Sequence, residues 1–474
     1  MQGLIQPVPQ NLQNDAAIDR VGATDALTRF VARTSFAGLP EPAVRVLRGC
    51  FLDYVGNSAF ASLHGESSPA IRAAIARLDA ADGPGTVIGE GRGYSWQYAA
   101  LLNGAYAHTL DFDDTNQGHP GAPVISAALV EAERVDATGT AFFEALAVGY
   151  EVYCRVGGAI TIAGYDRGFH ITAIAGIFGA VAAVSKLRGL DPAIIGNAFG
   201  LALSKASGSM QYLENGSWNK RLHPGFAAHD AFLCVTMAEA GVIGAAAAIE
   251  GRYGVLTSFT GAPQPGILTD GLGTQWTLLR TAIKPYPSCR FTHSAIDAAI
   301  ELRQQVAAAD LTRARIRIGL SPVAMKIVGE RSPAKLDPRN NVDAQFSVYF
   351  QTAAAWLDGK LEWSSYQRLG APDIVALAQR ITTHVDPAMK KIGSSFTVEI
   401  DGIMLSRTID TPLGEPERPL DWNGLTAKFL SLAEPVYGSA KAAAIEQAVR
   451  TMGPATAMSG LVKDLRRAAA APQS

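Results

Sequence analysis

The chain has 474 residues, of which 48% are hydrophobic and 18% are charged, so it can bury a large core and is not disordered over most of its length. Its 41 Lys and Arg residues against 43 Asp and Glu residues give a net charge of −2, which excludes the basic excess typical of nucleic-acid binding. The four cysteines form no Cys-x-x-Cys pair, so neither a disulfide framework nor a zinc site is indicated.

The N-terminal segment MQGLIQPVPQNLQND carries no basic region and no long apolar run, and therefore predicts no secretory signal. The longest uncharged apolar run, residues 171–185, is shorter than the ~20 residues that span a bilayer and predicts a buried core helix. From these features we expect a cytoplasmic protein with no nucleic-acid or membrane partner.

Residues 25–252 have the apolar spacing of packed helices. Apolar residues recur every three or four positions after Pro42 and again over 125–132 and 142–153, whereas alternating strand-like patterns are scarce. Many glycines stand beside alanines in these stretches, which indicates closely packed helices rather than flexible linkers.

The pattern changes after Gly261. Residues 314–321 alternate apolar residues with arginines, which is typical of a half-buried strand, and residues 396–400 alternate in the same way. Asp401-Gly402 then predicts a hairpin. Helical patterns lie between these strands and resume near the end of the chain.

The simplest organisation returns the last helices to the first domain. The sequence therefore predicts a mainly α fold, with a large all-helical domain that is discontinuous in sequence and an inserted α+β lid domain. We expect the first part of the helical domain, the lid and the return to the helical domain to cover residues 1–277, 278–410 and 411–474. The Ala-rich last residues are expected to be disordered.

Chemically reactive residues gather first in the segment from His108 to His119, which also contains three aspartates in an otherwise charge-poor chain. A capped, solvated helix end is the plain interpretation, because Asp and Thr favour helix N-caps. A metal–diphosphate site of the terpene-cyclase kind is another, but residues 115–117 break the required D-D-x-x-D spacing.

Three further clusters each adjoin a helix rich in small residues. His170 directly precedes the apolar run, where the positive helix terminus favours a neutral imidazole that can take a proton. Lys220 and Arg221 stand at an expected loop–helix junction, which suits an anion. Lys284 and Arg290 flank two prolines that fix the backbone.

Each cluster also has a purely structural interpretation, as a cap or a solvated turn. Together, however, the basic and His-bearing segments suit a pocket for a di- or tricarboxylate with general acid and base groups beside it. No nucleotide, zinc-protease or serine-hydrolase motif is present.

Six segments in order carry a family resemblance: LDFDDT followed by HP, GYEVYCRVG, GFHITAIAGIFGA, NKRLHPGFAAHDAF, YGVLTSF and KPYPSCRFTHSAIDA. Over about residues 25–455 the chain resembles the MmgE/PrpD family of 2-methylcitrate dehydratase and cis-aconitate decarboxylase relatives. The resemblance implies a discontinuous helical domain with an inserted lid, a homodimer, no cofactor and no metal. It also implies that the active-site positions are Asp111, Thr115, His119, His170, Lys220 and Lys284.

Two departures from the family pattern stand out. The spacer between Thr115 and His119 is short, and Phe350 occupies a position where many relatives have a tyrosine. We expect the adjacent Tyr349 to take part in substrate binding in its place.

The resemblance and the residues together predict a cofactor-independent lyase that removes a proton next to a carboxylate. Lys220 and Lys284, helped by Arg221 or Arg290, would neutralise the enolate-like charge. His119 or His170 would move the proton, and Asp111 would orient an imidazole or tune its pKa.

Dehydration of a 2-methylcitrate-like hydroxy acid is the favoured reaction. Decarboxylation or epimerisation of a related polycarboxylate, such as cis-aconitate or a substituted succinate, needs the same groups. A non-catalytic carboxylate-binding homologue is the alternative from another class.

Overall fold

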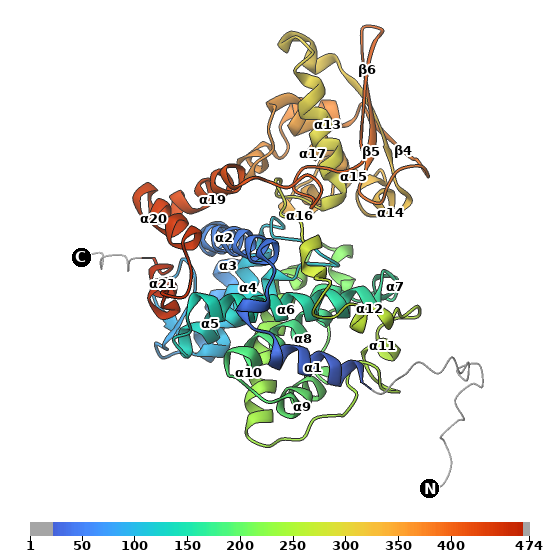
Figure 1. The fold of residues 1–474 in the computed structure, drawn as a ribbon. Helices are drawn as coiled ribbons and strands as arrows, with labels where there is room; N and C mark the ends of the chain where they lie inside the picture. Colours follow the sequence, from blue (N-terminus) through green and yellow to red (C-terminus); the bar gives the residue numbers. More distant parts are fainter. Residues whose placement is uncertain (1–21, 468–474) are drawn as a thin grey trace, which may run out of the picture.

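The structure of the protein is a computed structural model and describes residues 22–467, most of which are helical (Figure 1). This confirms the mainly α fold class. The expectations about a secretory signal and about disorder of the last residues concern segments that lie outside the described residues.

The helical body is built first from residues before position 278. Its helices are α1 (Ala23–Arg33), α2 (Glu41–His64), α3 (Ser68–Leu78), α4 (Trp96–Thr109), α5 (Gly121–Arg134), α6 (Gly139–Ile160), α7 (Ala163–Asp166), α8 (Ile171–Leu187), α9 (Pro192–Leu203), α10 (Asn219–Glu239), α11 (Val255–Ser258) and α12 (Gly266–Thr269). Two short strands, β1 (Gly85–Thr86) and β2 (Gly93–Tyr94), form a separate hairpin. The predicted core helix over 171–185 is α8, which is buried along almost its whole length.

Glycines bring these helices close together, as their sequence context predicts. A Cβ atom on Gly179 of α8 would lie 2.8 Å from the carbonyl oxygen of Gly149 on α6. A Cβ on Gly104 of α4 would lie 2.8 Å from the backbone of Gly225 on α10. Since real Cβ atoms do not approach other atoms so closely, both helix pairs require glycine at the crossing.

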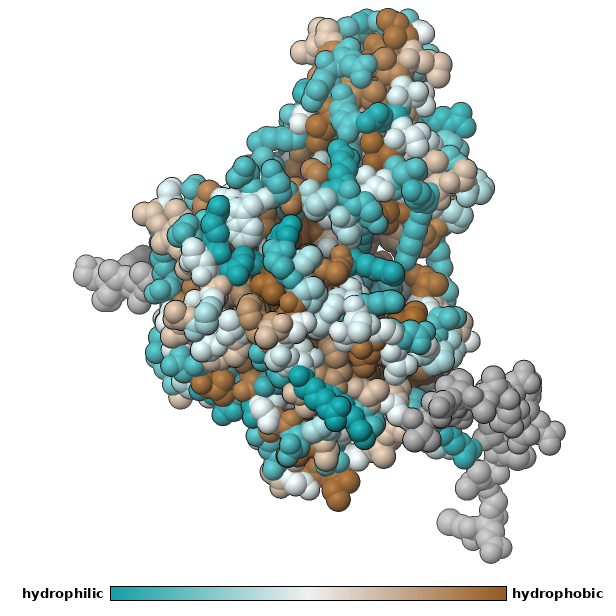
Figure 2. All heavy atoms as spheres, in the orientation of Figure 1, coloured by the Kyte–Doolittle hydropathy of each residue, from teal (hydrophilic) through white to brown (hydrophobic). Residues whose placement is uncertain are grey.

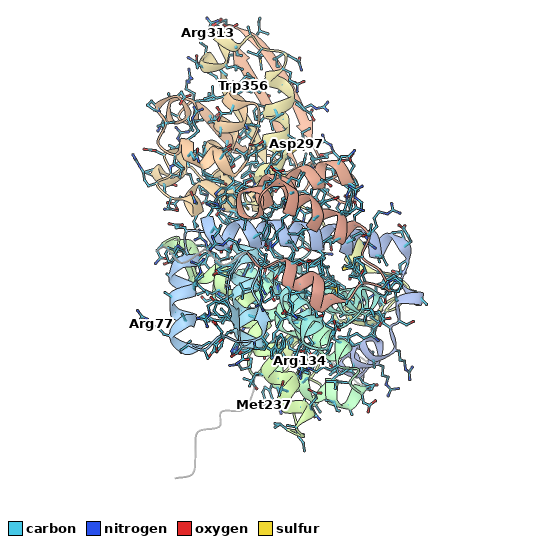
Figure 3. All side chains as sticks on the ribbon, turned by 90° about the vertical axis from the view of Figure 1, so that its left-hand side faces the viewer. Arg77, Arg134, Met237, Asp297, Arg313 and Trp356 are labelled. Carbon is cyan, nitrogen blue, oxygen red and sulfur yellow. The ribbon has the colours of Figure 1, made fainter. Side chains whose placement is uncertain are left out.

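The second region is α+β and has a hydrophobic core of its own. Its elements are α13 (His293–Arg303), β3 (Arg315–Leu320), α14 (Pro322–Ala324), α15 (Pro333–Leu336), α16 (Asn341–Gln345), α17 (Val348–Asp358), α18 (Pro372–Ala378), β4 (Ile381–Val385), β5 (Ser394–Ile400) and β6 (Ile403–Ile409). The sheet order is β4-β3-β5-β6, with β3 parallel to β4 and antiparallel to β5. Trp356, labelled in Figure 3, lies in this core and donates its indole N–H to the carbonyl of Leu311 at 3.0 Å.

The predicted hairpin is confirmed between β5 and β6. Asp401 and Gly402 have φ values of 50° and 84°, so both turn residues adopt the left-handed conformation that a two-residue hairpin favours.

The chain then returns to the helical body through α19 (Trp422–Tyr437), α20 (Ser439–Arg450) and α21 (Met458–Asp464). Figure 1 shows α19 and α20 beside α2, and their apolar residues belong to the same core as those before position 278. No helix within residues 22–467 combines the length and apolarity needed to cross a bilayer. All four cysteines are buried and unpaired.

The segment that leaves the helical body is fastened by a buried ion pair on α6. Arg155 bonds to Glu151 at 2.7 Å and donates to the carbonyls of Ile267, Asp270 and Gln275. Glu151 in turn accepts the backbone N–H groups of Thr277 and Leu278. This explains the GYEVYCR motif structurally, because it fixes the chain just before Lys284.

Candidate active site

The acidic segment lies in the connection between α4 and α5. Asp111 has a φ of 51°, a left-handed conformation that Asp adopts more readily than most residues. Thr115 pairs with Ala282 through two backbone hydrogen bonds of 2.8 and 2.9 Å. Because Ala282 precedes Lys284 by two positions, this pairing brings segments far apart in the sequence to one place.

Asp111 holds two lysines on one oxygen. Its Oδ1 lies 2.8 Å from the Nζ of Lys220 and 2.8 Å from the Nζ of Lys284, which also donates to the Asp111 carbonyl at 2.8 Å. Burial opposes ionisation of Asp111, but the two ammonium groups outweigh burial and lower its pKa below the usual value. Two ammonium groups thus share one carboxylate oxygen, and neither has a carboxylate of its own.

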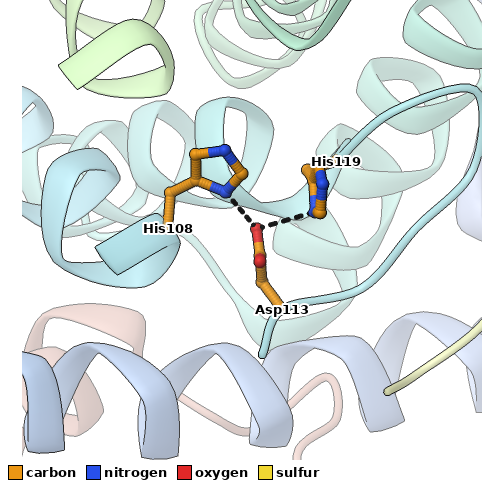
Figure 4. A group of neighbouring side chains, drawn as sticks. All are labelled: His108, Asp113 and His119. Atoms are coloured by element: carbon orange, nitrogen blue, oxygen red, sulfur yellow. Dashed lines mark hydrogen bonds and ion pairs between the residues drawn. The ribbon is translucent and has the colours of Figure 1, made fainter. Parts of the chain in front are cut away.

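A second carboxylate joins two histidines (Figure 4). The Oδ2 of Asp113 lies 2.7 Å from Nδ1 of His108 and 3.2 Å from Nδ1 of His119. Burial lowers the pKa of His108 to about 3 and also lowers that of His119. Burial opposes ionisation of Asp113, but its two imidazole partners hold its pKa well below the usual range. At neutral pH this is a carboxylate that orients two neutral imidazoles.

This arrangement corrects the expectation that Asp111 orients an imidazole. Nε2 of His119 lies 4.0 Å from Asp111 Oδ1, too far for a hydrogen bond, because the lysines engage that oxygen. Asp113, two positions on in the same motif, takes the orienting place. His108, Asp113 and His119 also have ligand-type atoms within 4.8 Å of one another, so they could hold a metal ion.

His170 has a different partner. At the start of α8 its Nδ1 lies 2.9 Å from Nδ1 of His223 on α10, and its ring stacks on that of His108 at 5.8 Å. Burial lowers the pKa of His170 well below its usual value and that of His223 to about 4. One ring must donate and the other accept, so the pair consists of two neutral imidazoles with complementary tautomers. His223 belongs to the NKRLHPG segment, which the sequence indicated as an anion site without a separate role for this histidine.

The two arginines lie at the edge of the cluster. Arg290 donates to the Thr115 hydroxyl at 2.7 Å and forms an ion pair with Glu415. Arg221 forms an ion pair with Glu66 at 3.2 Å.

The structure does not bring Tyr349 to this cluster. Its hydroxyl donates to the carbonyl of Gly329 at 2.7 Å and lies 2.8 Å from Thr383, inside the α+β region. Phe350 instead stacks on Tyr366, with ring centroids 5.9 Å apart. The expected substrate contact by Tyr349 therefore has no geometric support, because its hydroxyl is already bonded within another core.

A small, largely enclosed pocket lies beside Asp111 where the two regions meet. Gln345 of α16 donates across the junction to the carbonyl of Leu110 at 2.8 Å, and the ring of Phe346 lies 5.8 Å from Lys220 Nζ. The pocket is therefore shared by the helical and α+β regions. Its lining residues are His108, Thr109, Asp111, Tyr212, Ser217, Lys220, Arg221, Val342, Gln345 and Phe346.

The start of α10 confirms the expected loop–helix junction. The helix begins at Asn219, so Lys220 and Arg221 stand in its first turn, with His223 just beyond and Pro224 inside the helix. The close α4–α10 crossing at Gly225 holds this end of the helix beside the acidic segment.

Comparison with known proteins gives consistent matches. The MmgE/PrpD N-terminal domain model matches residues 25–268, and the MmgE/PrpD C-terminal domain model matches residues 286–453. A cis-aconitate decarboxylase-like protein of Aspergillus oryzae is 28% identical over 397 residues, or 77% of this chain and 82% of that protein. The cis-aconitate decarboxylase of Aspergillus terreus is 26% identical over 410 residues, or 80% of this chain and 82% of that protein. Human cis-aconitate decarboxylase is 26% identical over 349 residues, or 70% and 71% of the two chains.

Proposed function

The chain belongs to the MmgE/PrpD family, and on that premise we propose that it is a lyase acting on a small tricarboxylate. The observation that carries the proposal is the pair of ammonium groups on one oxygen of Asp111, of which Lys220 lines the pocket. A carboxylate of the substrate would pair with Lys220 there. The relatives favour decarboxylation of an aconitate-like acid, in place of the dehydration expected from the sequence.

In such a reaction the loss of carbon dioxide leaves negative charge on the adjoining carbon and carboxylate. Lys220, which lines the pocket, would stabilise this charge, and burial would strengthen the attraction. A proton must then reach the carbon. We assign its delivery to His119 or His170, after the anionic substrate has raised the pKa of that imidazole enough for the ring to bind a proton.

Dehydration of a hydroxy acid is the second candidate. It needs a base for the C–H proton and an acid for the leaving hydroxyl. The neutral His119 beside Asp113 suits the first role. The His170–His223 pair would fill the second only after it has taken up a proton, because burial keeps both rings neutral.

A panel of cis-aconitate, 2-methylcitrate, citrate and substituted succinates in deuterated water tests the proposal by NMR. We expect turnover of at least one acid, with solvent deuterium at the reacting carbon, and an unchanged rate in EDTA. Absence of both turnover and exchange with every acid would refute a lyase. A rate abolished by EDTA would instead favour metal-dependent chemistry at His108, Asp113 and His119.

We further propose that the polycarboxylate closes the α+β region onto the helical body, since the pocket has walls from both. Ligand binding should slow hydrogen exchange in residues 109–120 and 284–290 together. Closure would exclude water and strengthen the lysine–carboxylate attraction. Protection of one segment without the other would contradict a site that spans the junction.

A homodimer is the expected assembly, and we propose α10 as its contact face. Phe226, Leu233 and Met237 recur at helical spacing on α10 and are 49%, 39% and 42% exposed, and Ile243 just beyond is 84% exposed. Figure 3 shows Met237 at the lower end of the helical body, where Figure 2 also shows hydrophobic side chains at the surface. A second copy would bury this stripe.

Sedimentation should therefore give a mass near twice 49.9 kDa. Substituting Phe226→Glu together with Met237→Glu should shift the mass to the monomer value. The matched control is Leu78→Glu on α3, where the leucine is 68% exposed outside the stripe. A wild-type monomer at micromolar concentration would refute the proposal.

A further inference from the structure

Lys428 lies on α19, in the part of the chain that returns to the helical body after the α+β region. Its side chain is only 6% exposed, and its Nζ lies 2.5 Å from Oδ1 of Asp53 on α2. The same Nζ donates to the carbonyl of Phe112 at 2.7 Å and to the carbonyl of Lys284 at 2.8 Å. Two hydrogen bonds to carbonyls and one ion pair with a carboxylate thus surround one buried ammonium group.

These acceptors belong to the two segments that build the candidate active site. Phe112 directly follows Asp111, and Lys284 is itself one of the two lysines on Asp111. The carbonyls of Asp111 and Phe112 are consecutive, and each accepts from a buried lysine, Lys284 and Lys428 respectively. Two lysines therefore hold the backbone on the C-terminal side of Asp111, where its φ is positive.

An ion pair that served only stability would not need the two bonds that Lys428 makes to the carbonyls of Phe112 and Lys284. Burying an ammonium–carboxylate pair brings little net stability, because desolvation offsets the Coulomb attraction. The two carbonyl bonds, by contrast, fix the distance between the backbones that carry Asp111 and Lys284. Misplacing catalytic groups by about 1 Å can lower a rate by about 100-fold.

We propose that Lys428 is a positioning residue that sets the contact between Asp111 and Lys284 from the C-terminal helix. The inference rests on the proposed function, because the contact it sets is the one that presents Lys220 and Lys284 to the substrate.

The test separates positioning from stability. Lys428→Met leaves the Asp53 carboxylate buried without its partner and should destabilise the fold. The double variant Lys428→Met, Asp53→Asn removes both charges, so its melting temperature should recover toward wild type. Its kcat should nevertheless remain 10- to 100-fold below that of the wild type, because the methionine at position 428 cannot donate to the carbonyls of Phe112 and Lys284.

A matched control is the double variant Arg72→Met, Glu90→Gln. This partly buried ion pair, with 2.6 Å between Arg72 Nε and Glu90 Oε1, makes its further bonds to Ser62 and Tyr106. It should change stability by a similar amount and leave kcat within about twofold. A kcat that recovers along with stability in the Lys428 double variant would overturn the proposal.

Hydrogen exchange gives a readout that does not depend on turnover. The amides of Thr115 and Ala282, which bond the two segments together, should exchange at least tenfold faster in the Lys428 double variant than in the control. Unchanged exchange at both amides would also overturn the proposal. The two proposals can fail separately. If the wild type turns over no acid but the Lys428 double variant exchanges these amides faster, the positioning role of Lys428 is supported and the proposed function is refuted.

Discussion

Replacing Lys220 by Met should lower kcat/KM by about 1,000-fold, because one preorganised charge that meets the developing anion is worth about that much. Lys220 is 13% exposed and lines the pocket, whereas Lys284 is 2% exposed and lies behind Asp111. Loss of Lys220 removes the ammonium group that would contact the substrate in the pocket. Asp111 keeps Lys284 as its partner, so the free energy of unfolding should change by no more than about 1–2 kcal/mol.

Steady-state kinetics and thermal unfolding of the variant measure both effects. The matched control is Lys205→Met, which removes a half-exposed lysine paired with Asp230 at 3.2 Å and should leave the rate unchanged. A loss smaller than tenfold for Lys220→Met would remove Lys220 from the chemistry. A wild type that binds tricarboxylates without turning them over would point to a carboxylate-binding homologue.

Local signals in the sequence were sufficient for much of the fold. The hairpin at Asp401-Gly402 follows from two residues that tolerate positive φ between alternating strands. The buried helix α8 follows from an apolar run with no charge. Strand β4 could not be predicted in this way, because only its first residue is fully buried and its partner β3 lies about 60 residues earlier.

Similar limits apply to the site. The motifs identified the segments that meet, but the partner of each group depends on three-dimensional contacts. Asp111 and Asp113 are alike in sequence, yet one meets two ammoniums and the other two imidazoles. Lys428 carries no motif signal, because its partners are backbone carbonyls and an aspartate far away in the chain.

Neighbouring positions on a helix are also easily confused in sequence. Tyr349 and Phe350 both lie on α17, and successive residues there point about 100° apart. A hydroxyl at position 349 therefore lies in a different environment from one at position 350. The Tyr349 hydroxyl lies in the core of the α+β region and bonds to Gly329. A tyrosine lost at position 350 cannot be replaced by the one before it.

Replacing Asp113 by Asn should lower kcat by about 1,000- to 10,000-fold, as when an asparagine replaces the carboxylate that orients a catalytic imidazole. The carboxylate oxygen Oδ2 accepts from Nδ1 of His108 and lies 3.2 Å from Nδ1 of His119. Both rings contact the same oxygen, Oδ2, so an asparagine can place there either its oxygen or its NH₂ group. Its neutral oxygen is a weaker acceptor than the carboxylate, and its NH₂ group would force both rings into the opposite tautomer. The shape of the side chain is retained, so the loss would report orientation and charge.

The pH profile of kcat/KM distinguishes a base from a bystander. Burial lowers the pKa of His119, and the Asp113 carboxylate raises it, since a nearby negative charge favours the imidazolium. Removing that charge should lower the His119 pKa further, so the acid limb of the profile should move to lower pH in Asp113→Asn. The control is Asp230→Asn, which removes a surface carboxylate beside His229 and should leave the limb in place. The imidazolium form of His119 is stabilised by the Asp113 carboxylate, so loss of that carboxylate must lower the His119 pKa. An acid limb that moves to higher pH, or does not move, would therefore exclude His119 as the base.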